Sequence, residues 1–192
     1  MSGLLANTIS ASSGTTITVP SGTVIYNPGR VIQVKNTWLS DPTTFSLTGA
    51  YNLYQDIPNL FVTITPYKPS SRFYIACRVF CEGGNVNTPT WDGVWVIKRN
   101  GYAIGLPPQP GTLPVGQAMG VLGYYSNDQS STPETVFWDY VDTPNLAGPI
   151  TYQVALSSQQ GTTMYINRTV TDTNAGNFER GTSSITVWEI AG

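Results

Sequence analysis

One stretch near the middle of the chain, SSRFYIACRVFC at residues 70–81, constrains the fold more than any other. Side chains of a β-strand alternate between the two faces of its sheet. The residues on one face are all apolar: Phe73, Ile75, Cys77, Val79 and Cys81. The residues on the other face are Arg72, Tyr74, Ala76, Arg78 and Phe80. The second face is too aromatic for open water and too charged for an interior, so something else must cover it.

Two further stretches share this two-sided character, 135–141 (TVFWDYV) and 94–99 (VWVIKR). An antiparallel sheet with one face in water should alternate cleanly between apolar and polar residues, as ITYQVAL at 150–156 does. The second face is therefore expected to lie in an oligomer interface, whose centre favours aromatic side chains and arginine. The alternative is that the chain's own long loops cover it.

The rest of the chain has the composition of an all-β domain, because β-branched, hydroxyl-bearing and aromatic residues alternate with frequent Gly and Pro. Strands are predicted at 30–35, 44–48, 60–65, 72–81, 93–99, 119–125, 135–141, 150–156, 162–166 and 183–190. Asn100-Gly101 predicts a type I′ hairpin, whereas the proline-rich stretch 105–118 predicts a long loop. Evenly spaced strands without helical periodicity favour a two-sheet antiparallel jelly-roll sandwich.

The chain divides into two regions by charge. Residues 1–29 carry none, and their short β triplets are separated by glycines in a miniature repeat. Such a repeat is too small to bury its own apolar side, so it is expected to lie on the main body or to wrap with copies from neighbouring subunits. We predict an attachment and trimerising segment at 1–29 and a jelly-roll knob domain at 30–192. The contact residues expected in the segment are Ile17, Val19, Val24, Ile25 and Tyr26.

Charge and apolar runs exclude several classes of partner. The net charge is −2 without a basic cluster, so nucleic acid is not expected as a partner. No signal peptide and no apolar run of membrane-spanning length is seen, which predicts synthesis in a cytoplasm without membrane insertion. Cys77 and Cys81 would be about 13 Å apart along one strand, too far for a disulfide between them. They are expected to be reduced small hydrophobes, with an intermolecular bond as the alternative.

The sequence offers little for catalysis. It contains no histidine, which removes the Ser-His-Asp and Cys-His mechanisms and most zinc sites. Asp139 and Asp142 are the closest acidic pair, but Asp142 enters the turn DTPN and is interpreted as a turn residue. We therefore expect no enzyme, no catalytic residue, no metal and no cofactor. The candidate ligand-facing loop residues are Trp91, Asp92, Tyr124, Tyr125 and Asn127, whose alternative is packing against neighbouring loops.

Three segments resemble virion structural proteins of tailed bacteriophages, cyanophages prominently. TTITVPSGTVIYNPGRVIQV resembles their N-terminal segment, ITPYKPSSRFYIACRVF resembles the turn that enters their first long core strand, and SSITVWEIAG resembles their last strand. The resemblance implies a jelly roll like that of the complement and tumour-necrosis-factor trimers. Residues 100–148 match no part of this pattern and are expected to be the variable, outward-facing part.

The resemblance assigns scaffold roles and no catalytic residue. The attachment segment would be held by Ile17, Val19, Pro20, Gly22, Pro28, Gly29, Val31 and Val34. Pro66, Ser70 and Ser71 would lead into the trimer-facing sheet, which Ile185, Val187, Trp188 and Ile190 would close. Arg72 and Arg78 depart from the pattern, which favours smaller or apolar residues there, and a buried arginine would need an acidic partner from a neighbouring subunit.

Together these observations predict a virion component, a homotrimeric β knob that acts as capsid decoration or head fibre. Its partners would be further copies of itself and, through residues 1–29, capsid or tail proteins. The predicted trimer interface comprises Tyr74, Arg78, Phe80, Trp138, Tyr140 and Trp188. The alternatives are the receptor-binding tip of a tail fibre or another adhesin that binds a host-surface glycan, and a polysaccharide-cleaving enzyme that would use Asp139 or Asp142.

Overall fold

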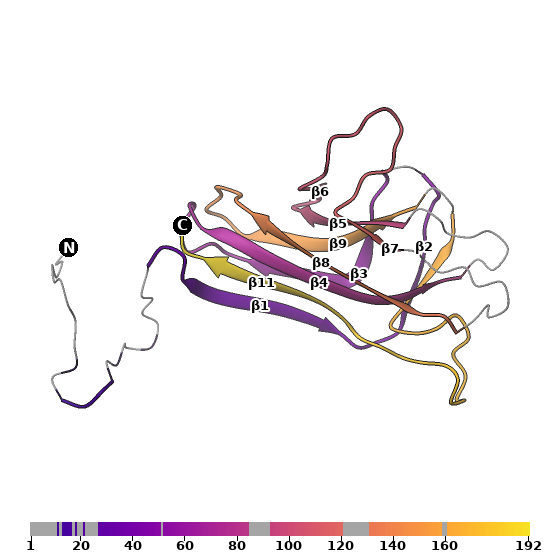
Figure 1. Cartoon of the computed structure of the whole chain (residues 1–192), viewed down its shortest axis with the longest axis horizontal. Helices are drawn as coiled ribbons and strands as arrows, with labels where there is room; N and C mark the ends of the chain where they lie inside the picture. The colour runs from indigo at the N-terminus through magenta and orange to yellow at the C-terminus, as the bar shows by residue number, and fades with distance from the viewer. Residues whose placement is uncertain are drawn as a thin grey trace.

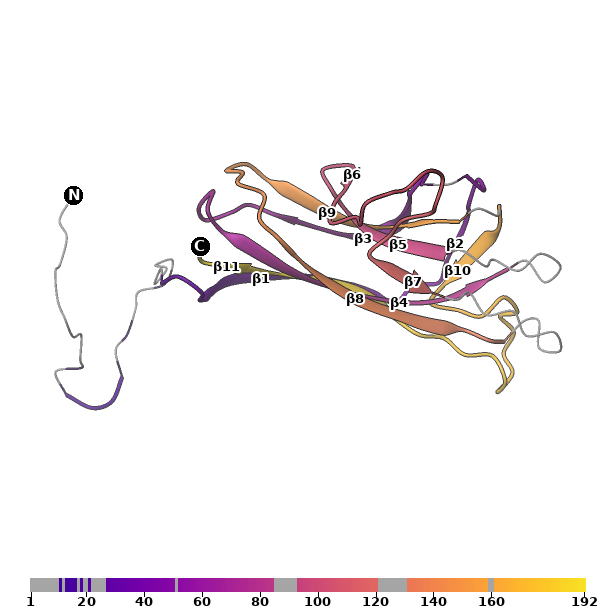
Figure 2. The same ribbon diagram turned by 45° about the horizontal axis from the view of Figure 1, so that its top comes forward.

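A computed structural model describes residues 11, 13–16, 18, 21, 27–50, 52–84, 93–120, 131–158 and 161–192. Within these residues the chain forms eleven β-strands, no α-helix, and two antiparallel sheets stacked face to face (Figures 1 and 2). The larger sheet contains β1 (Val31–Leu39), β2 (Thr43–Ser46), β4 (Arg72–Gly83), β8 (Glu134–Asp142), β10 (Thr163–Ile166) and β11 (Ser183–Ile190). The smaller sheet contains β3 (Gln55–Ile64), β5 (Gly93–Arg99), β6 (Tyr102–Ala103), β7 (Ala118–Gly120) and β9 (Ile150–Ser157).

Three strands of this sandwich are interrupted by loops. β10 and β11 lie end to end along one edge of β4, and β2 and β1 continue that arrangement on their outer edges. β6 and β7 likewise share one edge of β5. With each interrupted strand counted once, the larger sheet has the order first, eighth, third, sixth, and the smaller sheet the order second, seventh, fourth, fifth. The chain thus passes from one sheet to the other at every step except between the fourth and fifth strands, as in a jelly roll, which confirms the predicted fold class.

The core lies between the two sheets. The five residues of β4 predicted to face it, from Phe73 to Cys81, are all fully buried there. The rings of Trp95 and Trp138 meet at 5.9 Å between centroids, one from each sheet. Phe73 and Tyr152 also join the two sheets, at 5.8 Å. Both cysteines are free thiols buried in this core, as expected for small hydrophobic residues.

The two ends of the sandwich differ. At one end the Gly29 N–H donates to the Ala191 carbonyl at 2.7 Å, which ties the start of the domain beside its C-terminus. The opposite end carries the loop between β10 and β11, residues 167–182, here called the distal loop, which projects from the body (Figure 1). The molecule therefore has an end that carries both termini of the domain and a distal loop end.

The predicted strands correspond closely to the observed ones. The predictions at 93–99 and 183–190 have the observed bounds. The prediction at 30–35 was too short, because β1 continues to Leu39, and of 119–125 the described part is only the end of β7. Asn100 and Gly101 have φ angles of 48° and 88°, which fit the predicted type I′ hairpin. β6, the second strand of that hairpin, was not predicted.

Candidate interaction surface

The larger sheet turns one surface away from the core, here called the outer face. Strand register aligns its side chains in three rows that cross β1, β11, β4 and β8. The first row is Val34, Trp188, Tyr74 and Val141; the second is Asn36, Thr186, Ala76 and Asp139; the third is Trp38, Ser184, Arg78 and Phe137. The first row is thus apolar, the second is mostly polar, and the third has an apolar aromatic side chain at each end and two polar residues between them.

The outer face exposes large apolar side chains. Trp38 is 59% exposed, Phe137 64%, Val141 50% and Val34 48%. Single apolar residues on a protein surface are ordinary, but a contiguous apolar patch marks an interaction site. The first row is such a patch, because it is apolar across all four strands, and the exposed Trp38 and Phe137 lie beyond the polar second row, at the two ends of the third.

Aromatic contacts organise the middle of the outer face. The rings of Tyr74 and Trp188 lie 5.3 Å apart. The Arg78 guanidinium lies 5.0 Å from the centre of the Trp38 ring, and its Nη2 donates to the Thr182 hydroxyl at 2.8 Å. These contacts hold the side chains in one arrangement, so they would lose little conformational freedom on binding a partner.

One part of the outer face is covered by the chain itself. Gly181 lies against the ring of Phe80, so closely that a Cβ on Gly181 would come within 2.3 Å of the ring. At this end of β4 the alternative prediction is therefore correct: a loop of the same chain covers the second face of the strand, and Phe80 is half-buried. It does not apply to Phe137 and Val141 on β8, which stay exposed.

The second apolar face of β5 is also covered by other segments of the same chain. Val94 and Val96, which point away from the core, are 1% and 0% exposed. Tyr54 lies over this side of β5, because its carbonyl accepts from Lys98 Nζ at 3.2 Å and its hydroxyl donates to the Val115 carbonyl at 2.6 Å. The apolar second face of β5 is thus no candidate for a partner.

The structure corrects two of the predicted interface residues. Tyr74, Arg78 and Trp188 lie on the outer face, and Phe80 lies on its loop-covered end. Trp138 is only 6% exposed and packs in the core against Trp95. Tyr140 also faces inward, half-buried against the core. Both were placed on the wrong face of β8, because both faces of that strand are apolar and register cannot be read from one strand alone.

Three exposed residues of the outer face were missed. Trp38 lies beyond the predicted end of its strand, so a longer strand prediction would have included it. Phe137 and Val141 alternate with the residues that were chosen on β8. The signal that could have found them is Asp139, which lies on the same face of β8 as Phe137 and Val141. Because an aspartate is hard to bury, that face is the one expected to point away from the core.

Asp142 differs from the prediction as well. It is buried, and Arg99 Nη1 donates to its two carboxylate oxygens at 2.7 and 3.0 Å. The Tyr152 hydroxyl donates to the same carboxylate at 2.7 Å. Asp142 is therefore an inter-sheet connector rather than a turn residue, and it points into the sandwich while Asp139 points out of it.

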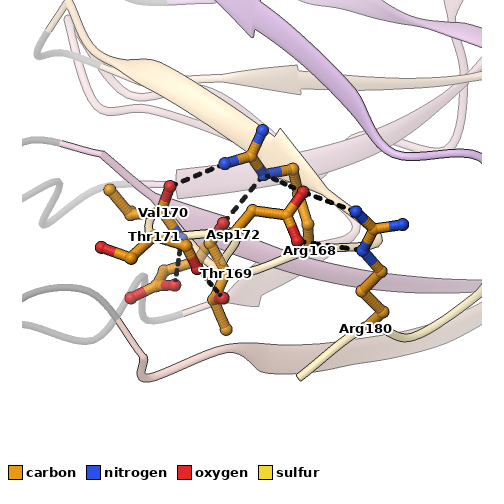
Figure 3. A network of polar contacts seen from close by, with 7 residues as sticks. Arg168, Thr169, Val170, Thr171, Asp172 and Arg180 are labelled. Carbon is orange, nitrogen blue, oxygen red and sulfur yellow. Dashed lines mark hydrogen bonds and ion pairs between the residues drawn. The ribbon is translucent and has the colours of Figure 1, made fainter. Parts of the chain in front are cut away.

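Charged residues hold the distal loop (Figure 3). Arg180 donates from Nε and Nη2 to the two carboxylate oxygens of Asp172 at 2.9 and 2.8 Å, and Arg168 Nε lies 3.7 Å from the same carboxylate. The hydrogen bond from Arg180, together with the positive charge of both arginines, lowers the pKa of Asp172. The loop thus presents a fixed polar surface at the distal end.

A buried carboxylate anchors the distal loop to the body. Glu82 is 3% exposed and accepts from the Val170 N–H at 2.7 Å. Its other oxygen accepts from the N–H and the hydroxyl of Thr132, at 3.0 and 3.1 Å. Main-chain donors of this kind compensate the charge of a buried carboxylate.

Other predicted site residues lie outside the described residues. They are the attachment residues Ile17, Val19, Val24, Ile25 and Tyr26 and the loop residues Trp91, Asp92, Tyr124, Tyr125 and Asn127. In the part of the chain that the structure describes, no three His, Cys, Asp or Glu residues gather as a metal site would require. That part also holds no helix with the length and hydropathy of a membrane span.

Comparison with models of known protein families gives no match, and comparison with curated proteins gives no similar sequence. Among solved structures, the chain is similar to one from the infectious bursal disease virus Gx strain, with 11% identity and a TM-score of 0.34. It is also similar to one from the infectious bursal disease virus VP2 subviral particle, with 12% identity and a TM-score of 0.35. Each similarity covers 91% of this chain but only 46% and 45% of the viral chains, so this chain spans about half their length.

Proposed function

We propose that this protein is a non-enzymatic structural component of a virion, a homotrimeric β knob that serves as capsid decoration or head fibre. The observation that carries the proposal is the outer face, where Trp38, Phe137 and Val141 are each at least half exposed. The three segments that resemble phage virion proteins supply the biological setting. The jelly roll is compatible with that setting but does not by itself imply it.

Burial of the outer face between subunits would drive assembly. Apolar surface removed from water contributes about 25 cal/mol per Å². The exposed apolar side chains on β1 and β8 lie on the two borders of the sheet, so each chain can offer one border to each of two neighbours. A ring of three closes on such contacts without leaving a free face.

The two ends of the sandwich suit a knob on a particle surface. Residues 1–29 join the body where Gly29 meets Ala191, so the attachment segment would dock on the capsid at that end. The distal loop, held by Glu82 and Asp172, would then point away from the particle. Docking by strand pairing and packing would suit an uncharged segment.

Antibody labelling of purified virions tests the structural role. An antibody against the distal loop should label intact particles at regular positions on the head. Labelling only at the tail would instead support the tail-fibre alternative, and particles without the protein would contradict a virion role. Light scattering on the full chain, with and without residues 1–29, separates docking from subunit assembly.

The distal loop favours a second candidate, a tip or adhesin that binds a host-surface glycan. Its charged groups are already held in place by Asp172, and such a preorganised polar surface suits a sugar. A glycan array tests this candidate, with Arg180→Ala, Trp91→Ala and Tyr125→Ala as the informative variants. Binding that all three variants retain, or no binding at all, would count against it.

A further inference from the structure

Arg78 and Asp139, the two charged residues in the three rows of the outer face, form no ion pair with any residue that the structure describes. Arg78 forms no ion pair with any described residue; its polar partner is the Thr182 hydroxyl, and its Nε is shielded from water without an acceptor. Asp139 is exposed and forms neither an ion pair nor a hydrogen bond through its carboxylate within the described ranges. Each is therefore available for a partner of opposite charge.

Arg78 and Asp139 are near each other on the outer face but do not pair. Arg78 is directly opposite Phe137, and Asp139 is two residues further along β8, a diagonal separation of about 7 to 8 Å between backbones. The guanidinium lies over Trp38 on β1, which is on the other side of β4 from β8. The arginine is thus turned away from the acid of its own chain.

We propose that Arg78 of one chain forms an ion pair with Asp139 of a neighbouring copy when outer faces associate. This inference rests on the proposed homo-oligomer and specifies its polar contact. The three rows carry one charge of each sign on different strands, so they are complementary to themselves, while Arg72 lies beyond the first row opposite Ile190. In a closed ring each chain gives Arg78 to one neighbour and Asp139 to the other.

The surroundings of the pair favour a second copy as its partner. Four strands about 4.8 Å apart and roughly nine residues long give the whole outer face a flat footprint of about 500 Å², which a ring divides between two neighbours, against the roughly 800 Å² of accessible surface that each partner buries in one standard interface. Trp38 and Phe137 flank Arg78 in the same row. Once associated, these side chains would exclude water and strengthen the attraction between the charges.

Charge exchange on the full-length chain tests the proposal. The variants are Asp139→Arg, Arg78→Glu and their combination, with circular dichroism to confirm folding. Sedimentation equilibrium should show subunit dissociation constants raised at least about 30-fold in each single variant, because a like-charge contact replaces the pair. The combined variant should recover most of the loss. Asp139→Asn, which removes the charge without adding bulk, should give a smaller increase and covers the event that a reversed charge prevents folding.

A matched control is Asp41→Arg, which makes the same charge change at another exposed position, where the backbone carbonyl accepts from Asn167. It should leave association unchanged. Single variants that associate like the original chain, or a combined variant that fails to recover, would overturn the ion pair and leave the oligomer standing. An original chain that is monomeric would instead overturn the proposed homo-oligomer, and the pair with it.

Discussion

Asp142 connects the two sheets through its side chain. It belongs to β8 of the larger sheet, whereas its partners Arg99 and Tyr152 belong to β5 and β9 of the smaller one. Burial raises the pKa of Tyr152, and the hydrogen bond to Asp142 with its negative charge adds to the effect. A charge held in this way is costly to leave without its partner.

Asp142→Asn should therefore lower the free energy of unfolding, by about 2 to 3 kcal/mol, because Arg99 would lose its anion while remaining half-buried. Urea denaturation checks this value. The matched control is Asp56→Asn, whose carboxylate is 50% exposed in its ion pair with Lys98 and which should cost under about 1 kcal/mol. Equal losses in the two variants would contradict the buried role of Asp142.

The core thiols predict a dependence of stability on alkaline pH. Burial raises the pKa values of Cys77 and Cys81 above their ordinary value of 9.0, and nearby carboxylates add to the effect. The unfolded chain therefore releases these protons first, so the free energy of unfolding is fully retained below pH 9 and falls as the pH rises beyond it.

Between about pH 8 and about pH 10.5 the loss should be about 2 kcal/mol per thiol. Urea denaturation at both pH values checks it. A Cys77→Ala, Cys81→Ala variant is the control, because it should be less stable overall but lose less stability with rising pH. An unchanged pH dependence in that variant would assign the effect to other groups.

At the scale of the elements, the three two-sided strands have different explanations. β5 is covered by the segment around Tyr54 and Val115, the far end of β4 by the distal loop, and β8 by no described residue. Alternation in the sequence predicts strands and their inner residues, as Phe73 to Cys81 confirm. It does not predict which loop covers a second face, because that depends on contacts between segments far apart in the chain.

The same limit explains the errors at β8. Trp138 and Phe137 are both large and apolar, and only the register with β4 shows which of them faces the core. The role of Asp142 was likewise hidden, because its partners Arg99 and Tyr152 lie in other strands. Turn chemistry, by contrast, is local, and Asn100-Gly101 was predicted correctly from two residues.

The contact of the distal loop with β4 gives a prediction at this scale. Gly181→Ala should lower the free energy of unfolding by about 1 to 3 kcal/mol, because the new methyl group would displace the Phe80 ring or the loop. Gly176→Ala is the control in the same loop, since its Cβ would meet open space. Thermal unfolding and limited proteolysis of the loop measure the difference. Equal sensitivity of the two variants would contradict the packing of the loop on Phe80.

At the scale of the whole molecule, the jelly roll closes one core and leaves the outer face with several exposed apolar side chains. The inner faces of the two sheets pack against each other and form this core. The outer face has exposed aromatic side chains on both border strands, Arg78 on the inner strand β4 and Asp139 on the border strand β8. A second copy of the chain offers the complement of this surface, which is why we propose a homo-oligomer.

Phe137→Ser should weaken association without unfolding the chain, because Phe137 is 64% exposed and contributes its apolar surface only to a partner. Tyr102→Ser is the matched control, since Tyr102 is 79% exposed in the hairpin of the smaller sheet. Sedimentation velocity at a series of concentrations compares the two variants. Equal association in both would remove the outer face from the interface.

The most direct test of the account is the mass of the full-length chain in solution, measured by light scattering after size exclusion at micromolar concentration. The account predicts about 62 kDa, three times the 20.8 kDa of one chain. A mass of 20.8 kDa across the concentration range would contradict it, because Trp38, Phe137 and Val141 would then face water in the functional form of the protein.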